Sequence, residues 1–467
     1  KSRDKDKRKR HARMGNFDDE DDVDDGYSPT STGHIPSGGI YRRHAIVCLL
    51  VCGFGGLLFG YNTAVIAGAL PLLIEDFYGK LTPAKQGVLT CSILLGATIG
   101  STFGSIIAST IGKPKTILII GLATLIGAVG LAATPYLWVM VLFRELLGLG
   151  VGIASVICGT FAADYSPPKL RGLITASFQV SITLGILISY IIGIIFQDVS
   201  GGYHYMFGLG ALPGIGLICV VPFCNLQPLE DSPINVGMNN TKTDEETEED
   251  YNQRNSGLTV YVQMFRRAQK GVFLGVVLST ALQFTGINAI MYYGPSVFAA
   301  AGLSTGALTA TTIIGFWNFL STFPALILVV RVSRRVLLLS TLLVMAVTCF
   351  LLGLDYLFFA DTSFGGIFSI VLLLFYISAF EAGIGSLFWV VMTEFFPSEY
   401  KDSGASLMNI IQWTLNIVLS ASFPSLVSLF GTGPLFIFFS LVGFIAIGIF
   451  FFYLPRPAEV EIDRYEA

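Results

Sequence analysis

Amide side chains inside long apolar stretches carry the most informative chemistry in this sequence. Gln283 and Asn288 lie within the apolar segment 272–300. An amide offers both a donor and an acceptor to a ligand rich in hydroxyl groups. Because the two residues are five apart, their side chains would point about 140° away from each other on an ideal helix. They converge on one ligand only if the helix breaks, and Gly286 between them permits a break. The pattern predicts binding of a polar solute rather than bond-breaking chemistry.

No pattern typical of an enzyme or an ATP-driven pump accompanies these amides. The sequence has no recognisable nucleophile–base pair, no phosphate-binding loop and no metal-ligand spacing among its seven cysteines. Gly148-x-Gly150-x-Gly152 looks like part of a nucleotide fingerprint, but no strand precedes it. These glycines, like Gly96 and Gly100, predict close helix packing instead. We therefore expect no enzymatic activity, no cofactor and no bound metal.

The composition of the chain is that of a membrane protein. Hydrophobic residues make up 53% of the 467 residues and charged residues only 13%, and the mean hydropathy is +0.69. A soluble chain of this length needs more charge to cover its surface. The apolar residues form runs about as long as the roughly 20 residues that a helix needs to cross a bilayer, and short alternating segments typical of a barrel are absent. Twelve runs are predicted as transmembrane helices: 44–74, 88–108, 115–134, 136–163, 172–196, 204–223, 272–300, 308–330, 336–358, 366–393, 403–429 and 431–454.

The positions of the basic residues orient the predicted helices. Of the 28 lysine and arginine residues, ten precede the first helix, and most others fall in alternate loops, among them Lys113 and Lys169. Only Lys80 and Lys85 fall on the opposite side. Basic residues of short loops stay in the cytoplasm, so we expect both termini there and an even number of helices. We predict a multi-pass protein of the plasma membrane that works in the lipid bilayer as a monomer, with no nucleic-acid partner.

Two related motifs indicate an internal repeat. An acid, a proline and a base recur at the same spacing, as Asp164, Pro167 and Arg171 after the fourth predicted helix and as Glu394, Pro397 and Lys401 after the tenth. The loops after the second and the eighth helix are also alike, because Lys113 follows the former and Arg334 and Arg335 follow the latter. Two related sets of six helices, with a site at their interface, are typical of secondary transporters.

The predicted fold is therefore an all-α membrane protein with twelve transmembrane helices in two pseudo-symmetric six-helix halves. Residues 1–40 are charged and then rich in glycine, serine and proline, which predicts disorder. The predicted segments are a disordered cytoplasmic tail (1–43), an N-terminal half (44–225), a cytoplasmic loop with a surface helix (226–271), a C-terminal half (272–455) and a second cytoplasmic tail (456–467).

Three motifs resemble the sugar porter family of the major facilitator superfamily. They are Gly56-Leu-Leu-Phe-Gly-Tyr61-Asn62-Thr63, Gln283-Phe-Thr-Gly286-Ile-Asn288-Ala-Ile-Met-Tyr292-Tyr293, and Trp389 with Glu394-Phe-Phe-Pro397. The resemblance runs from about Gly53 to Pro455, and the first motif is most similar to facilitative glucose transporters. It implies the major facilitator fold and a small-molecule sugar substrate.

The resemblance also implies a sugar site. The family's substrate contacts fall on Gln179, Gln283, Asn288, Asn318, Trp389 and Asn416. Amides suit the hydroxyl rim of a sugar, and a tryptophan face stacks on the C–H side of its ring. The family often has a second glutamine before Gln283, but Leu282 stands there, so one sugar contact is missing. Gln412 and Trp413 fit the family's Asn-Trp pair imperfectly and are expected to pack rather than bind.

The family's gating and coupling positions fall on eight residues. They are Asn62, Arg144, Asp164, Arg171, Arg334, Arg335, Glu381 and Glu394. The gate motifs are degraded, since Ser109 and Val330 replace the usual acids after helices 2 and 8. Glu381 is expected to belong to the charge network of the inner gate.

Asn62 determines the mechanism that the sequence favours. Proton-coupled members of the family carry an aspartate there, which pairs with the arginine of helix 4, here Arg144. An amide does not change its protonation at physiological pH. The sequence thus favours facilitative uniport of a hexose, with glucose the first candidate, by alternating access. The alternative is a proton-coupled symporter of a sugar or a polyol such as myo-inositol, with Glu145 or Glu381 as the proton carrier.

Overall fold

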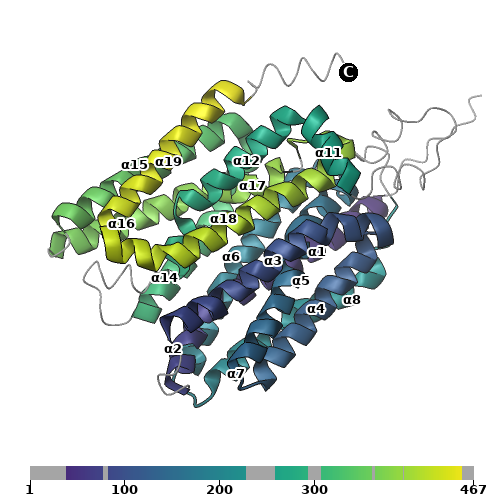
Figure 1. The fold of residues 1–467 in the computed structure, drawn as a ribbon. Coiled ribbons are helices and arrows are strands. Elements are labelled where there is room, and N and C mark those ends of the chain that lie inside the picture. The colour runs from purple at the N-terminus through teal and green to yellow at the C-terminus, as the bar shows by residue number, and fades with distance from the viewer. Residues whose placement is uncertain are drawn as a thin grey trace, which may run out of the picture.

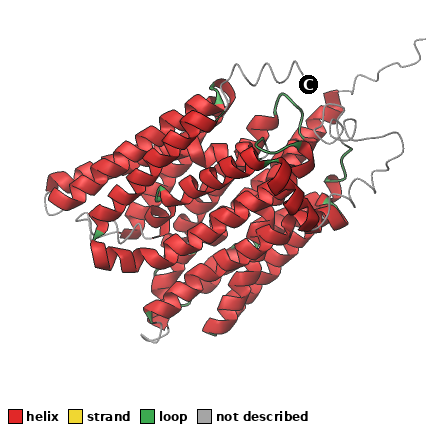
Figure 2. Cartoon of the chain, turned by 45° about the horizontal axis from the view of Figure 1, so that its top comes forward, coloured by secondary structure: helices red, strands yellow, loops and turns green. Residues whose placement is uncertain are grey.

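The computed structural model shows an all-helical protein. It describes residues 38–76, 82–227, 258–292, 307–359, 363–392 and 394–454, and every regular element in these ranges is a helix (Figure 2). Hydrocarbon offers no hydrogen-bond partner to a polypeptide backbone, and a helix satisfies its backbone internally. Among the described residues, eleven helical segments are long and apolar enough to cross a membrane.

The helices form two groups that lie side by side (Figure 1). The first group holds α1 (Gly38–Ala64), α2 (Ile66–Asp76), α3 (Pro83–Ile111), α4 (Lys113–Ala133), α5 (Leu137–Tyr165), α6 (Arg171–Phe196), α7 (Gly202–Leu209), α8 (Leu212–Val220) and the short turn η1 (Val221–Phe223). The second group holds α12 (Gln269–Phe284), α14 (Ala307–Arg331), α15 (Arg334–Phe358), α16 (Ser363–Phe380), the π-helical turn η2 (Glu381–Gly385), α17 (Ser386–Val391), the turn η3 (Ser398–Tyr400), α18 (Lys401–Phe430) and α19 (Thr432–Tyr453), with α11 (Leu258–Arg267) before it.

The two groups meet along a seam made by few helices. On one side of the seam α18 packs against α3 and α5, and on the other side α14 and α17 pack against α6. The short helix α11 contacts both groups, because it packs on α12 and α18 and the Tyr261 hydroxyl lies 3.2 Å from the Ser105 hydroxyl of α3. Side chains from both groups therefore meet at the seam.

Helix α18 corresponds to the predicted span 403–429, and its 30 residues are long enough to cross a bilayer. It carries four buried polar residues, Asn409, Gln412, Asn416 and Ser420. At spacings of three and four they line one face of the helix. This helix faces lipid less than it faces the seam.

Glycines set how closely α3 and α5 approach each other. A Cβ atom on Gly96 would clash with the backbone carbonyl of Glu145, and one on Gly148 would clash with that of Ile93. The close helix packing that the sequence predicts at these glycines is confirmed. Small residues at such contacts let backbones approach within the bilayer, where packing rather than hydrophobicity holds helices together.

The helix break predicted at Gly286 is present. Helix α12 ends at Phe284, Gly286 has a φ of +98°, and helical structure resumes over residues 287–292. Positive φ is strongly disfavoured for residues with a Cβ. The break turns the chain so that Asn288 Nδ2 lies 2.5 Å from Gln283 Oε1, although a continuous helix would direct the two side chains apart.

We expect Gly286→Ala to destabilise the protein by roughly 1–3 kcal/mol, because the alanine would be strained and its Cβ would lie 2.5 Å from Cδ2 of Phe439. Gly448→Ala in α19 is the control, since no atom lies within 4 Å of a Cβ there. Melting temperatures of the purified variants in detergent provide the measurement. Equal melting temperatures for the two variants would show that the break does not require glycine.

Candidate substrate site

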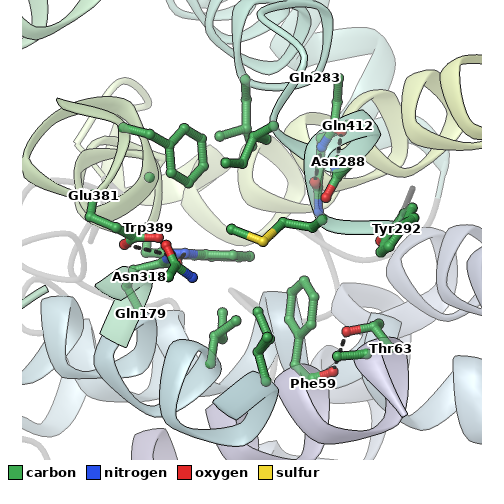
Figure 3. Close-up of a pocket in the computed structure, with 18 of the residues that line it drawn as sticks. Phe59, Thr63, Gln179, Gln283, Asn288, Tyr292, Asn318, Glu381, Trp389 and Gln412 are labelled. Atoms are coloured by element: carbon green, nitrogen blue, oxygen red, sulfur yellow. Dashed lines mark hydrogen bonds between the residues drawn. The ribbon is translucent and has the colours of Figure 1, made fainter. Parts of the chain in front are cut away.

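A pocket with an empty volume of about 690 Å³ lies between the two helix groups (Figure 3). Its described lining consists of Phe59, Thr63, Ala64, Gln179, Ile182, Ile186, Tyr190, Leu282, Gln283, Ile287, Asn288, Met291, Tyr292, Asn318, Phe380, Glu381, Gly385, Trp389 and Gln412. Five of the six residues that the sequence assigned to a sugar site are among them, and Asn416 is not.

Three amides form a hydrogen-bonded chain on one wall of the pocket. Asn288 Nδ2 donates to Gln283 Oε1, and Gln283 Nε2 donates to Gln412 Oε1 at 2.8 Å. Gln412 Nε2 in turn donates to Asn409 Oδ1 at 3.2 Å. Gln412, which the sequence assigned to packing, therefore lies in the lining and orients Gln283. Its place on the polar face of α18, one turn from Asn409 and Asn416, is the signal that could have revealed it.

A second polar cluster lies on the opposite side of the pocket (Figure 3). Gln179 Nε2 of α6 donates to both carboxylate oxygens of Glu381, at 3.0 and 3.3 Å. The indole nitrogen of Trp389 donates to Gln179 Oε1 at 2.7 Å. Asn318 of α14 is labelled beside these groups, and its Oδ1 is buried without a hydrogen-bond partner in the described structure. This cluster joins the two helix groups through the pocket.

The π-helical turn η2 places Glu381 in the pocket. Glu381 is 1% exposed and begins the turn, within which Gly383 departs from helical geometry at φ −112° and ψ −112°. A Cβ on Gly383 would clash with the Thr341 hydroxyl, so the close approach of α15 requires a glycine. A wider turn changes which side chains face inward, and such turns occur often at functional sites. The sequence assigned Glu381 to an inner-gate network, whereas its carboxylate contacts Gln179.

Aromatic rings hold Trp389 in place. Its ring centroid lies 4.8 Å from that of Phe178 and 5.9 Å from that of Phe59, both in edge-on contact. Trp413 of α18 is buried 4.9 Å from Phe59 and does not line the pocket. The rings around Trp389 restrict its rotation, so its indole N–H stays directed at Gln179.

Asn416 does not line the pocket but forms a hydrogen bond with a residue that does. Its Nδ2 donates to the hydroxyl oxygen of Tyr292 at 3.3 Å, and its Oδ1 accepts from Ser420 at 3.0 Å. Tyr292 itself lines the pocket. In this arrangement Asn416 positions Tyr292 instead of contacting the cavity.

Asn62 and Arg144 lie in the first helix group and do not line the pocket. Asn62 Nδ2 donates to the backbone carbonyls of Leu58, at 3.0 Å, and Gly210, at 3.3 Å. Arg144 is fully buried, and its guanidinium nitrogens have no hydrogen-bond partner among the described residues. The guanidinium carbon lies 6.0 Å from the centre of the Phe207 ring. Asn62 and Arg144 thus make no described hydrogen bond to each other.

Four charged residues form a chain across the seam at one end of the protein. Asp164 Oδ2 forms an ion pair with Lys113 Nζ at 2.5 Å, and Asp164 Oδ1 forms one with Lys401 Nζ. Lys113 Nζ also lies 3.2 Å from Asp402 Oδ1. Lys113 and Asp164 belong to the first group, and Lys401 and Asp402 to the second. The four-residue cluster therefore ties the two groups together.

The second group holds a counterpart of the Lys113–Asp164 pair. Arg334 Nη2 lies 3.4 Å from Glu394 Oε1, but this carboxylate is 47% exposed, compared with 3% for Asp164. Arg335 donates to the backbone carbonyls of Leu454 and Phe451. Arg171 begins α6, where a Cβ on the next residue, Gly172, would lie 3.7 Å from Arg334 Nη2. The repeated motif thus recurs as a repeated ion pair, buried in one half and exposed in the other.

No group of three histidine, cysteine, aspartate or glutamate side chains suited to a metal ion occurs in the part of the chain that the structure describes. The polar groups of the pocket are amides, one carboxylate, hydroxyls and an indole. They can orient a polyhydroxylated solute through hydrogen bonds.

Comparison with known proteins identifies the class to which this architecture belongs. The sequence profile described as "Sugar (and other) transporter" matches residues 47–467. The galactose-proton symporter of Escherichia coli strain K12 is 31% identical over 443 residues, which cover 90% of this chain and 93% of that protein. The D-xylose transporter of Levilactobacillus brevis is 28% identical over 407 residues, covering 84% of this chain and 89% of that protein.

Solved structures agree with this assignment. The proton:xylose symporter XylE of the major facilitator superfamily, bound to 6-bromo-6-deoxy-D-glucose, superposes with a TM-score of 0.74 at 25% identity, covering 89% of this chain and 97% of that one. A partially occluded inward-open form of XylE from E. coli gives 0.69 at the same identity, covering 89% and 99% of the two chains. The chain belongs to the sugar transporter family and has the major facilitator fold. It is a multi-pass membrane transporter.

We expect Asp164→Asn to destabilise the protein by about 3–5 kcal/mol, because it leaves the buried ammonium groups of Lys113 and Lys401 close together without a shared carboxylate. Asp402→Asn is the matched control, with an expected loss of about 1 kcal/mol or less, since Asp402 is 37% exposed. Thermal unfolding of the two purified variants gives the comparison. Indistinguishable unfolding curves would mean that Asp164 does not hold the seam.

Proposed function

We propose that this protein transports a monosaccharide together with a proton, by alternating access of one pocket to the two sides of the membrane. The observation that carries the proposal is the Glu381 carboxylate, which is buried in the pocket wall and hydrogen-bonded to Gln179. The names of two relatives support it, since the galactose-proton symporter and the arabinose-proton symporter of E. coli strain K12 are 31% and 27% identical to this chain.

The pocket offers both kinds of surface that a monosaccharide needs. Gln283, Asn288 and Gln412 present amide groups to hydroxyls, and Ile182, Leu282 and other apolar side chains cover the C–H faces of the ring. A net gain of about 0.5–1.5 kcal/mol per hydrogen bond gives roughly 3–9 kcal/mol for six bonds, before the entropy cost of binding. Dissociation constants from tens of micromolar to tens of millimolar follow, and weak binding suits a carrier that must release its cargo.

Glu381 is the group that we propose takes the proton. A symporter needs a side chain that gains and loses a proton on the substrate's path, and a carboxyl group does this whereas an amide does not. Asn62, at the family's usual position, is an amide held by backbone carbonyls. Glu145, the other carboxyl that the sequence suggests as a carrier, does not line the pocket.

The four-residue cluster of Lys113, Asp164, Lys401 and Asp402 is proposed to close the pocket at its end of the protein. The positive-inside rule assigns this end to the cytoplasm, together with both termini. Transport then requires the two helix groups to rock about the pocket until the cluster separates.

Facilitative uniport remains the second candidate because of Asn62. Its amide donates to the carbonyls of Leu58 and Gly210, and no carboxylate among the described residues forms a hydrogen bond with Arg144. A carrier with this arrangement would move sugar down its gradient without a proton.

Uptake into liposomes distinguishes the two candidates. We expect an inward proton gradient to accelerate uptake of labelled galactose, glucose or xylose by the wild-type protein. Glu381→Gln should abolish the acceleration but keep sugar exchange between loaded and external pools, because the amide keeps its hydrogen-bonding shape and loses the titratable group. Glu145→Gln should keep the acceleration.

Each alternative predicts a different result in the same assay. Uptake by the wild-type protein that ignores the proton gradient would establish uniport. If Glu145→Gln loses the acceleration and Glu381→Gln keeps it, the proton carrier is Glu145 on α5 and not Glu381.

A further inference from the structure

The end of the pocket formed by Glu381, Gln179, Trp389 and Asn318 holds more hydrogen-bond acceptors than donors (Figure 3). We call it the Glu381 end. The Gln179 amide donates to the Glu381 carboxylate and the Trp389 indole to Gln179 Oε1, so the amide group of Asn318 is the remaining donor at this end. The Asn318 Oδ1 atom is buried with no donor among the described residues. A buried acceptor without a donor costs free energy, so this end is incomplete until a ligand supplies one.

The Glu381 carboxyl group also lacks a cationic neighbour in the described pocket lining. No lysine, arginine or histidine is among the described residues that line the pocket. Glu381 takes part in none of the ion pairs found in the described ranges, and its neighbour Gln179 is neutral. A buried carboxylate is normally paired with a cation or protonated. In this pocket either a proton or a positively charged group of the substrate fulfils that role.

A primary ammonium group matches both properties. It brings one positive charge and three donors, whereas a sugar hydroxyl brings one donor and no charge. Each carboxylate oxygen of Glu381 has two lone pairs and accepts from Gln179, so both oxygens can accept further hydrogen bonds from an ammonium group. At the other end, the Gln283, Asn288 and Gln412 amides offer donors and acceptors together, which suits hydroxyl groups.

A metal ion fits this end less well than an ammonium group. Hard cations take about six or more oxygen ligands, whereas the side chains of the Glu381 end hold four oxygens, one of which already accepts from Trp389. The Gln179 N–H₂ group also points at both carboxylate oxygens, where a bound metal ion would meet its hydrogens. An ammonium group, in contrast, can donate hydrogen bonds to the Glu381 carboxylate while the Gln179 amide also donates to it.

We propose that the Glu381 end binds the ammonium group of an amino sugar, so that a 2-amino-2-deoxyhexose such as D-glucosamine is bound more tightly than its neutral analogues. This inference rests on the proposed function of the pocket as a monosaccharide site. A charged sugar brings its own cation, so Glu381 then needs no proton to be neutralised.

Competition in reconstituted liposomes tests the proposal on the wild-type protein. Exchange of labelled D-glucose is inhibited with unlabelled D-glucose, D-glucosamine and 2-deoxy-D-glucose, the last being a neutral analogue without a donor at the same carbon. At about pH 6.5, where an amine of this kind is charged, we expect D-glucosamine to inhibit at about tenfold lower concentration than D-glucose. At about pH 9 the advantage should disappear, because the amine has lost its charge.

Variants assign the effect to the Glu381 end. Glu381→Gln should lower the ratio of glucosamine to glucose affinity about tenfold, and Asn318→Leu should lower it less. Glu75→Gln is the control, because Glu75 is an exposed carboxylate at the end of α2 and its loss should leave the ratio unchanged.

The outcomes separate the two proposals. Absence of exchange with any monosaccharide would overturn the proposed function and this inference together. If glucose is exchanged but D-glucosamine inhibits no better than 2-deoxy-D-glucose, the proposed ammonium site is wrong. Monosaccharide transport would still be supported by that result. If D-glucosamine still inhibits at lower concentration than D-glucose in Glu381→Gln, the ammonium group binds somewhere other than Glu381.

Discussion

Hydrocarbon forms no hydrogen bonds, and this constraint organises the whole protein. Every polar side chain in a membrane-spanning helix must find its partners within the protein or lie at a cavity. In this chain many of these partners lie at the seam, where Gln283, Asn288 and Gln412 bond to one another and Gln179 bonds to Glu381 and Trp389. The interactions that satisfy the helices therefore also build the pocket. A sugar that enters exchanges some of these internal bonds for its own.

The sequence predicts the helices well because their signal is local. Apolar runs, charge placement and repeated motifs all lie in short stretches, and the observed helices follow the predicted runs closely. The break at Gly286 was also predictable, because two amides five residues apart face each other only across a break. The polar face of α18 was predictable too, because Asn409, Gln412 and Asn416 recur at spacings of three and four within an apolar run, and all three are buried.

The arrangement of side chains within the site was less predictable, for physical reasons that differ from residue to residue. The π-helical turn at Glu381 is not visible in a pattern of 3.6 residues per turn, so the carboxylate's position in the pocket comes from the structure. Gln412 is one methylene longer than the family's asparagine, and that length lets it bond to both Gln283 and Asn409. Asn416 follows the family pattern but lies behind Tyr292. Asn62 is the one residue that favours uniport, whereas coupling requires only that some carboxyl group lies on the substrate's path.

The four-residue cluster at the seam has a consequence for how membrane voltage acts on this carrier. Each helix group contributes one lysine and one aspartate, so each side of the cluster is electrically neutral. When the groups separate in the proposed cycle, Lys113 can keep Asp164, and Lys401 remains next to Asp402 in the chain. The separation moves almost no net charge through the electric field, and a membrane potential does work only on charge that moves. The membrane potential would then act on the charge of the transported proton or charged sugar, and not on the helices that move during transport.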